Sequence, residues 1–476
     1  MRIRVFSYCS LTSARGETNR LVRTHRQLLL MAVVLVGLSS LAFSSTVAVG
    51  TCTTLPFYSS IQLAVNSVSS GSTIKICPGT YAEQVLITKS LTLIGVGANG
   101  LSGSGAAGQY NPVITSPAGG VTANVSDLAG GDPIFYQIAV VNPTPASTVK
   151  VNISDIAIDG SNNQISGCGM NLTGIYYQNA NGTINEVVAR NQELPSGLGG
   201  CQDGDGILIE SGYGSGGTAV VTIQNSSVHG YDKNGITVDG SGTTATLTGN
   251  YVIGQGATPV TAQNGIQISD GANGSVKSNT ITDDLYINPS DCSTTTPPSC
   301  FGSSGILVFD SGATVGHPLT ISGNTISNTQ LPIIAFGDSN GTADYNTVTA
   351  NKITSTQAAG VFLDDGIDLC SNNNMATGNF VFNSSGSGIH IDSTCVESTG
   401  PSGNGTTVSA NTINEACAGV LTGGGTGNTE SGNITANVVE TIFPGDSCPV
   451  SASGDSAKKA ARLTKTTKLR PLPLLH

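Results

Sequence analysis

The sequence contains no tryptophan, and only 10% of its 476 residues are charged. Glycine, in contrast, occupies 62 positions, which is typical of a chain rich in β-turns and poor in helices. Basic residues are scarce in the central part, since residues 52–450 hold 7 Lys plus Arg against 28 Asp plus Glu. A body this acidic repels nucleic acid and anionic membranes, so we expect neither as a partner.

Long apolar runs are absent after the N-terminal region, so no later segment is expected to span a bilayer. Six arginines precede the apolar run Leu28–Leu38, and small residues follow it. This order predicts a secretory signal over residues 1–48, with cleavage between Ala42 and Gly50. A membrane span is the alternative, but two serines interrupt the run. We therefore expect a secreted, periplasmic or cell-surface protein, and a monomer.

No two cysteines have the CxxC spacing of many metal sites, so a metal role for the thiols is not favoured. Ten cysteines follow the predicted signal, an even number that suits disulfides in an oxidising compartment. Pairing neighbours in order would close loops of about one repeat each, although sequence alone does not establish the connectivity. The predicted disulfide cysteines are Cys52, Cys77, Cys168, Cys201, Cys292, Cys300, Cys370, Cys395, Cys417 and Cys448.

Residues 200–440 repeat one pattern at intervals of mostly about 30 residues. It consists of Gly-Ile, an alternating apolar segment, an acidic residue, a Gly/Ser turn, a second strand segment and Asn-x-Ile/Val. A period of this length predicts a solenoid, because one unit cannot bury its own apolar face. The copies begin at Gly206, Gly235, Gly265, Gly305, Gly360, Gly388 and Gly419, with a degenerate copy at Pro332.

The asparagine of each copy recurs about two residues before Ile or Val. In a solenoid, equivalent side chains lie one above another at the strand spacing of roughly 4.8 Å. Stacked amides can then form a hydrogen-bonded ladder. The predicted ladder residues are Asn225, Asn250, Asn279, Asn324, Asn351, Asn379, Asn411 and Asn437.

The segment before the repeats predicts a short amphipathic helix over Tyr58–Val68, placed to cover the open end of the solenoid. The surrounding stretch Ile61–Gly95 resembles the opening coil of secreted parallel β-helix proteins, including the pectin methylesterases and NosD-like proteins of the pectin lyase-like superfamily. The resemblance implies an all-β fold, a right-handed single-stranded parallel β-helix with three strands per coil, here over residues 52–450. Residues 451–476 change to Lys, Ala, Thr and Pro and predict a disordered basic tail.

Alternation along each Gly-Ile segment predicts that the Ile and the residue two positions later point inward, while the residue between them faces solvent. The acidic residue that follows has a simpler interpretation, a turn in which the carboxylate accepts backbone N–H bonds. The functional interpretation is an acidic stripe that faces carbohydrate or binds Ca²⁺. The predicted solvent-facing residues are Leu208, Thr237, Gln267, Leu307, Phe362, His390 and Leu421, and the acidic residues are Glu210, Asp239, Asp270, Asp310, Asp338, Asp364 and Asp392.

Three successive copies concentrate acidic residues around a histidine. The strand spacing places Asp364 about 5 Å from Asp392, and His390 beside Phe362. Carboxylates at that separation suit a retaining glycosidase, and larger separations suit an inverting one. The order Asp, Asp-Asp, His resembles that of polygalacturonase-type glycoside hydrolases, but their asparagine-threonine-aspartate tripeptide and basic uronate-binding motif have no counterpart. The candidate catalytic residues are Asp338, Asp364, Asp365, His390 and Asp392.

Other candidate sites have less support. Asp203 and Asp205 form a pair of oxygen ligands for a calcium ion, but the remainder of a calcium loop is absent. His229 follows a strand segment and is interpreted as a turn residue. Gly79-Thr80-Tyr81-Ala82-Glu83 is similar to an early pectin methylesterase motif, whereas that family's later aspartate and arginine motifs are missing.

These observations leave two main functions open. The first is a secreted β-helix that acts on or binds polysaccharide, with hydrolase or lyase activity if it is an enzyme and with Ca²⁺ as the one cofactor considered. The second is a non-catalytic adhesin-like protein that displays loops from a rigid solenoid. A copper-maturation role, implied by the NosD-like resemblance, is disfavoured because the chain has only 4 Met and 5 His.

Overall fold

The computed structural model describes residues 44–97, 112–287, 299–337, 342–354, 365–393, 403–448 and 468–471. The chain divides into two units, Met1–Ser44 and Ser45–His476, and nearly all described residues belong to the second. Most of the predicted signal and most of the basic tail fall outside the described residues. Among those described, no helix has the length and apolar character needed to cross a membrane.

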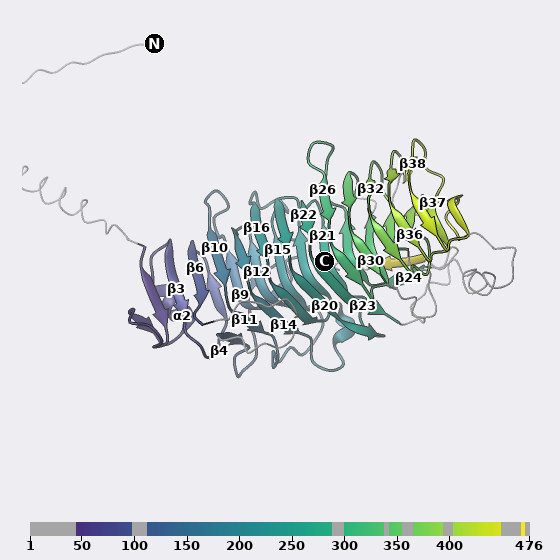
Figure 1. Cartoon of the computed structure of the whole chain (residues 1–476). Coiled ribbons are helices and arrows are strands. Elements are labelled where there is room, and N and C mark those ends of the chain that lie inside the picture. Colours follow the sequence, from purple (N-terminus) through teal and green to yellow (C-terminus); the bar gives the residue numbers. More distant parts are fainter. Residues whose placement is uncertain are drawn as a thin grey trace, which may run out of the picture. The chain divides into compact units, whose positions relative to one another are not determined.

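The second unit is built from three long parallel sheets, and successive strands along the chain pass from one sheet to the next (Figure 1). Neighbours within a sheet are therefore strands from consecutive coils, as a parallel β-helix requires. Sheet A contains β1 (Thr46–Val49), β2 (Phe57–Tyr58), β3 (Ser72–Ile76), β6 (Leu91–Gly95), β10 (Lys150–Ser154), β13 (Asn181–Asn185), β16 (Ala219–Gln224), β19 (Thr243–Thr248), β22 (Asn273–Lys277), β26 (Leu319–Ser322), β29 (Asn346–Thr349), β32 (Met375–Thr377), β35 (Thr407–Ser409) and β38 (Thr429–Ser431).

Sheets B and C repeat the same coil order. Sheet B contains β4 (Thr80–Ala82), β7 (Val113–Thr115), β11 (Ala157–Asp159), β14 (Val188–Gln192), β17 (Ser227–Tyr231), β20 (Tyr251–Thr258), β23 (Thr280–Tyr286), β27 (Thr325–Ser327), β30 (Lys352–Thr354), β33 (Phe380–Phe382), β36 (Thr412–Asn414) and β39 (Ile434–Ala436). Sheet C contains β5 (Val85–Ile87), β9 (Pro133–Val141), β12 (Asn171–Gln178), β15 (Asp205–Glu210), β18 (Asn234–Asp239), β21 (Asn264–Ser269), β25 (Ser304–Phe309), β28 (Leu331–Phe336), β31 (Ile367–Leu369), β34 (Ile389–Ile391), β37 (Ala418–Thr422) and β40 (Glu440–Pro444).

Few elements lie outside these sheets. The strand β8 (Ala123–Ser126) pairs antiparallel with β9, and β24 (Ser299–Gly302) pairs with β41 (Lys468–Pro471) near the C-terminus. A short 3₁₀ helix covers Gly199–Cys201.

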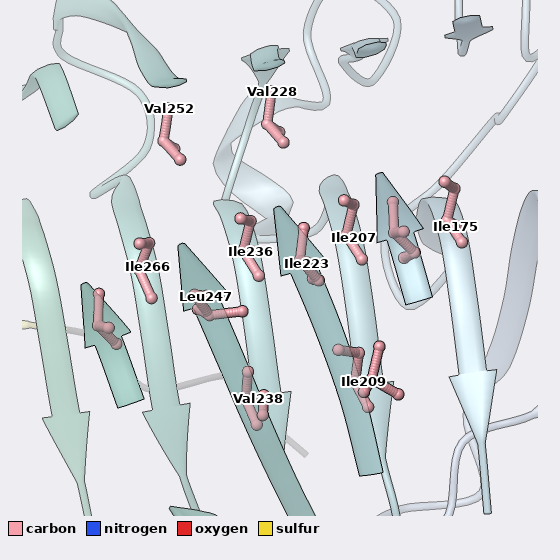
Figure 2. Close-up of a cluster of buried hydrophobic side chains, with 14 of the residues drawn as sticks. Ile175, Ile207, Ile209, Ile223, Val228, Ile236, Val238, Leu247, Val252 and Ile266 are labelled. Atoms are coloured by element: carbon pink, nitrogen blue, oxygen red, sulfur yellow. The ribbon is translucent and has the colours of Figure 1, made fainter. Parts of the chain in front are cut away.

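The core is a continuous cluster of inward-pointing Ile, Val and Leu side chains from all three sheets (Figure 2). Ile207 and Ile209 are both fully buried, which confirms the predicted inward positions of the repeat. Each such side chain stabilises the fold by roughly 1.5–3 kcal/mol through burial. Close packing requires glycine at position 206, because a Cβ there would lie 2.2 Å from Val228 Cγ1 in the core.

The predicted asparagine ladder runs through seven consecutive coils. From Asn250 to Asn411, the Nδ2 of each ladder residue donates to the Oδ1 of the next over 2.9–3.0 Å. The backbone N–H of each donates to the same oxygen. Each Nδ2 also donates to a backbone carbonyl of the preceding coil, as from Asn351 to Ile321 O at 3.0 Å. The ladder therefore satisfies buried polar groups that the turns would otherwise leave unpaired.

The residue predicted for each end of the ladder is wrong. Asn225 bonds to Asn185 instead, while its neighbour Ser226 occupies the ladder position and donates its N–H to Asn250 Oδ1. At the other end Asn433 completes the ladder. Asn437 is exposed and donates to Asn414. The turns of the end coils have two residues, as do those of their neighbours, so the ladder position itself is unchanged. The prediction instead chose an asparagine one residue before that position at the first end and one in the following turn at the other end.

The predicted helix is α2 (Ile61–Ser67), with Ser60 as its N-cap. Its buried side chains Ile61, Ala64 and Val65 are those predicted from the apolar stripe. Glu83 accepts the backbone N–H groups of Ile61 and Gln62, each over 2.9 Å. A carboxylate at this end also interacts favourably with the helix dipole. The family-like motif at residues 79–83 therefore holds the capping helix in place.

The coil that contains Gly360 follows a different register from the predicted one. The strand of sheet C in this coil is β31, so the repeat is represented by Gly366-Ile367 rather than by Gly360-Val361. Both dipeptides begin an apolar segment, and only pairing with β28 and β34 distinguishes them. The register partner of His390 in the preceding coil is therefore Asp368, whereas the predicted neighbour Phe362 lies outside the described residues.

The outward face of sheet C is buried, contrary to the prediction that it faces solvent. Every described residue of the predicted solvent-facing set is at most 5% exposed. Alternation identifies the outward face correctly but does not reveal whether other chain lies over it. In the N-terminal half, part of the cover comes from the segment after β8, where Leu128 N donates to Glu210. The buried residues are Leu208, Thr237, Gln267, Leu307, His390 and Leu421.

Three disulfides join cysteines that are neighbours in the sequence, as pairing in order predicts. The bridges are Cys52–Cys77, Cys168–Cys201 and Cys417–Cys448. Cys370 is also disulfide-bonded, while Cys292 and Cys395 lie outside the described residues and the side chain of Cys300 is not described. Local bridges of this kind tie a coil to its neighbour.

Removing the Cys417–Cys448 bridge is expected to lower the free energy of unfolding by about 2 kcal/mol. This is the low end of the usual range, because the bridge constrains only the last coils. Urea unfolding of the double variant Cys417→Ser/Cys448→Ser, compared with the parent chain, measures the loss. An unchanged midpoint would show that these coils need no covalent tie.

Candidate functional site

A histidine and four aspartates converge on the outward face of sheet C near its C-terminal end. His390 is the middle residue of β34, and Asp365 lies two residues before β31 in the preceding coil. The Nδ1 of His390 lies 3.1 Å from Asp365 Oδ2. The other oxygen of Asp365 accepts both the N–H and the hydroxyl of Ser387, over 2.6 and 2.7 Å. The carboxylate is thus fixed by three contacts and fixes the imidazole in turn.

The opposite ring nitrogen of His390 faces the coil that follows β40. Its Nε2 lies 3.4 Å from Asp446 Oδ1, which is an ion-pair contact. Hydrogen-bond geometry is not met there, and Nε2 has no hydrogen-bond partner among the described residues. Asp446 is held by Ser393, whose N–H donates to Oδ1 over 3.2 Å. The imidazole therefore lies between two carboxylates from different coils.

Two further carboxylates complete the group, which we call the His390 cluster: Asp365, Asp368, His390, Asp392 and Asp446. Ligand atoms of Asp365, Asp368 and His390 lie within 4.8 Å of one another, and the same holds for His390, Asp392 and Asp446. Asp368 and Asp392 approach each other equally closely beside the disulfide-bonded Cys370. Asp368, His390 and Asp392 are buried, while Asp365 and Asp446 are partly exposed.

The electrostatics of the cluster favour a charged pair. Burial acts to lower the pKa of His390, but the charges of Asp392 and Asp365, with hydrogen bonding, outweigh it and raise that pKa well above its usual value. Burial acts to raise the pKa of Asp365, yet His390 and the Ser387 donors hold it below its usual range. An imidazolium beside an ionised carboxylate is the resulting state at neutral pH.

The structure brings together three of the five predicted catalytic residues, Asp365, His390 and Asp392. Asp338 and Asp364 lie outside the described residues, so their place in the cluster stays a prediction. Asp368 was missed because the coil was assigned the wrong register. Asp446 was missed because it follows the last strand of sheet C and has no local pattern that marks it.

The predicted acidic stripe is divided into separate groups. Glu210 and Asp239 pair in register on β15 and β18. Both are buried. Glu210 accepts hydrogen bonds from Leu128 N and from Tyr176 Oη, and Asp239 accepts from Tyr213 Oη over 2.6 Å. Glu210 is bonded to the segment after β8, and Asp239 is bonded to Tyr213, so neither carboxylate belongs to an exposed stripe.

Of the two predicted calcium ligands, Asp203 is partly exposed and Asp205 is buried. Asp205 is fully buried, and burial raises its pKa to about 7. Burial lowers the pKa of nearby Lys233 to about 7, and its Nζ donates to Ala262 O over 3.0 Å. Among the described residues, neither Asp203 nor Asp205 belongs to a set of three His, Cys, Asp or Glu residues whose ligand atoms lie within 4.8 Å of one another. Calcium binding here stays a prediction.

His229 is a strand residue, not a turn residue, because it lies inside β17 in register with Arg190. Arg190 forms an ion pair with Asp159 over 2.9 Å. Burial and the charge of Arg190 lower the pKa of His229.

The model of the family described as right handed beta helix region matches residues 150–342 and 205–435, which together exceed half of the chain. The chain belongs to this family. The match confirms the right-handed parallel β-helix expected from the opening coil. No curated protein matches this chain.

Solved structures with a similar course of the chain include the A-module of a mannuronan C-5 epimerase from Azotobacter vinelandii, with 15% identity, a TM-score of 0.46, and coverage of 80% of this chain and 94% of that one. A lacto-N-biosidase from Eubacterium ramulus has 12% identity and a TM-score of 0.47, covering 88% and 72%. The periplasmic alginate epimerase AlgG has 12% identity and a TM-score of 0.40, covering 78% and 77%.

Proposed function

We propose that this β-helix protein hydrolyses a neutral polysaccharide at the His390 cluster. The observation that carries the proposal is the position of His390, oriented by Asp365 and flanked by carboxylates from adjacent coils. Hydrolysis of a glycosidic bond needs a proton donor for the leaving oxygen and a carboxylate at the anomeric carbon. The family's long parallel sheets would offer successive subsites to a polymer chain.

The roles follow from the contacts. His390 donates its Nε2 proton to the leaving oxygen, and Asp365 acts as a positioning residue through Nδ1. Asp392 or Asp368 attacks the anomeric carbon, and water then releases the sugar and returns a proton to the imidazole. Ligand atoms of His390 and Asp392 lie within 4.8 Å of each other, which is nearer to the separation of acid and nucleophile in retaining enzymes than to the larger separation in inverting ones.

A neutral substrate is favoured by the charge around the cluster. Residues 353–457 contain no Lys or Arg, so the carboxylate of a uronate would find no cationic partner in this part of the sequence. The three disulfides support a location in an oxidising compartment, where extracellular polysaccharide is accessible.

Release of reducing ends from a panel of neutral and acidic polysaccharides tests the proposal. We expect cleavage of a neutral glycan by the parent chain, and a loss of at least about 100-fold in rate for Asp365→Asn, because the imidazole loses its anionic partner. Glu430→Gln, on β38 of sheet A in the same region, is the control and should keep full activity. Absence of cleavage on the whole panel would refute the proposal and favour the non-catalytic alternative.

A further inference from the structure

His390 has a buried nitrogen that faces carboxylates without a hydrogen bond. The residue is 5% exposed, and its Nε2 has no hydrogen-bond partner among the described residues. Such an arrangement is costly unless a partner is supplied, because a buried polar atom loses its bonds to water. Asp446 Oδ1 lies 3.4 Å from this nitrogen.

That separation fits two ligands of one metal ion. A Zn²⁺ ion binds imidazole nitrogen at about 2.0–2.1 Å and carboxylate oxygen at about 2.0–2.2 Å, usually with tetrahedral geometry. Two such ligands at a tetrahedral angle are about 3.4 Å apart, which matches the distance from Nε2 to Asp446 Oδ1. A ligand atom of Asp392 lies within 4.8 Å of ligand atoms of both His390 and Asp446, close enough to be a third ligand.

The second ring nitrogen of His390, Nδ1, has the carboxylate partner that metal-binding histidines usually have. Metal-bound histidines commonly donate their second N–H to a carboxylate, which fixes the ring orientation and increases the basicity of the ligand nitrogen. Asp365 makes this contact with Nδ1 over 3.1 Å. Two bonds from Ser387 hold Asp365 itself.

We propose that His390 Nε2, after it releases its proton to solvent, forms a binding site with Asp392 and Asp446 for a divalent transition-metal ion of the Zn²⁺ class. The nitrogen ligand distinguishes this site from a calcium site, because Ca²⁺ prefers oxygen ligands only. Three protein ligands leave a fourth position for water or another small ligand. Asp446 has 22% of its side chain accessible to solvent, so the proposed site is not sealed on that side.

Zinc binding is measured directly on the full chain, freed of metal with a chelator and titrated with zinc chloride in a calorimeter. We expect one Zn²⁺ per chain and saturable binding. Asp446→Asn should weaken the affinity at least about tenfold, since it removes a ligand charge. Asp365→Asn should weaken it about 10–100-fold through the loss of ring support.

The control is His317→Gln, because His317 is an exposed histidine outside the cluster and should not affect binding. Circular dichroism and thermal unfolding without metal would establish that each variant is folded. The proposal is overturned if the parent chain binds no zinc saturably, if His317→Gln weakens binding as much as Asp446→Asn, or if Ca²⁺ binds as tightly as Zn²⁺.

One consequence rests on the proposed hydrolysis. The same Nε2 would serve as proton donor and as metal ligand, so bound zinc should inhibit cleavage, and a chelator should restore it. The calorimetric titration needs no substrate. A failure of the hydrolase proposal would therefore leave zinc binding intact, and a failure of zinc binding would leave hydrolysis unaffected.

Discussion

Replacing Asn351 with leucine is expected to lower the free energy of unfolding by about 4 kcal/mol, the largest effect of any single substitution considered for this chain. The Asn351 Oδ1 accepts two bonds from Asn324, and its Nδ2 donates to Ile321 O and Asn379 Oδ1. Leucine makes none of these bonds. Several buried polar groups would lose a partner together, at about 1–3 kcal/mol for each group that finds no replacement.

The matched control is Asn414→Leu, the same change three residues after a ladder asparagine. Asn414 is partly exposed on β36, and its side chain has one described hydrogen bond, from Asn437 Nδ2 over 2.8 Å. We expect a loss below about 1 kcal/mol there. Urea unfolding at neutral pH compares the variants. Equal losses at both positions would mean that the ladder contributes no more than an ordinary exposed contact.

Stability is also expected to fall as the pH rises from about 4.5 to about 7, with about 3 kcal/mol of the change due to Glu210. Burial raises the pKa of Glu210 from 4.5 to about 7, while Tyr176 and Leu128 act in the opposite direction. The folded protein therefore binds this proton more tightly than the unfolded chain. The contribution is complete below pH 4.5 and is lost as the pH approaches 7.

The test is urea unfolding at several pH values between 4 and 8, for the parent chain and for Glu210→Gln. Glutamine keeps an oxygen acceptor for Leu128 N and cannot ionise, so the dependence on pH should become shallower. It should not vanish, because the pKa of Asp205 is also raised to about 7. Glu440→Gln, at an exposed position, is the control. A variant as pH-dependent as the parent would contradict the assignment.

The fold was largely predictable, because every coil of a solenoid presents the same requirements. Inward Ile207 and Ile209, the ladder from Asn250 to Asn411 and the capping helix all follow from residue periodicity. The incorrect predictions occur where two positions in the sequence fit the repeat pattern equally well. Gly360 and Gly366 both begin an apolar segment, and only the pairing of strands selects the second.

The candidate site was predictable only in part, for two physical reasons. Asp446 reaches His390 from a later coil, so proximity arises from stacking and not from any local pattern. The burial of His390 depends on whether chain lies over the outward face, which alternation along a strand does not encode. His390 was found because it lies in the Gly388-Ile389 copy, and Asp365 because it belongs to the Asp364-Asp365 pair that follows the copy assigned to Gly360.

The asparagine ladder has a consequence for how this chain can change in length. The side chain of each ladder asparagine bonds to groups of the coils immediately before and after its own, as Asn351 does to Asn324 and Asn379. Duplication or loss of a complete coil would therefore join two compatible surfaces and leave the remaining contacts as they were. A single residue inserted between an asparagine and the strand that follows it would instead displace the side-chain amide from the asparagine ladder. Gene duplication in whole-repeat steps is thus the change that this architecture tolerates best.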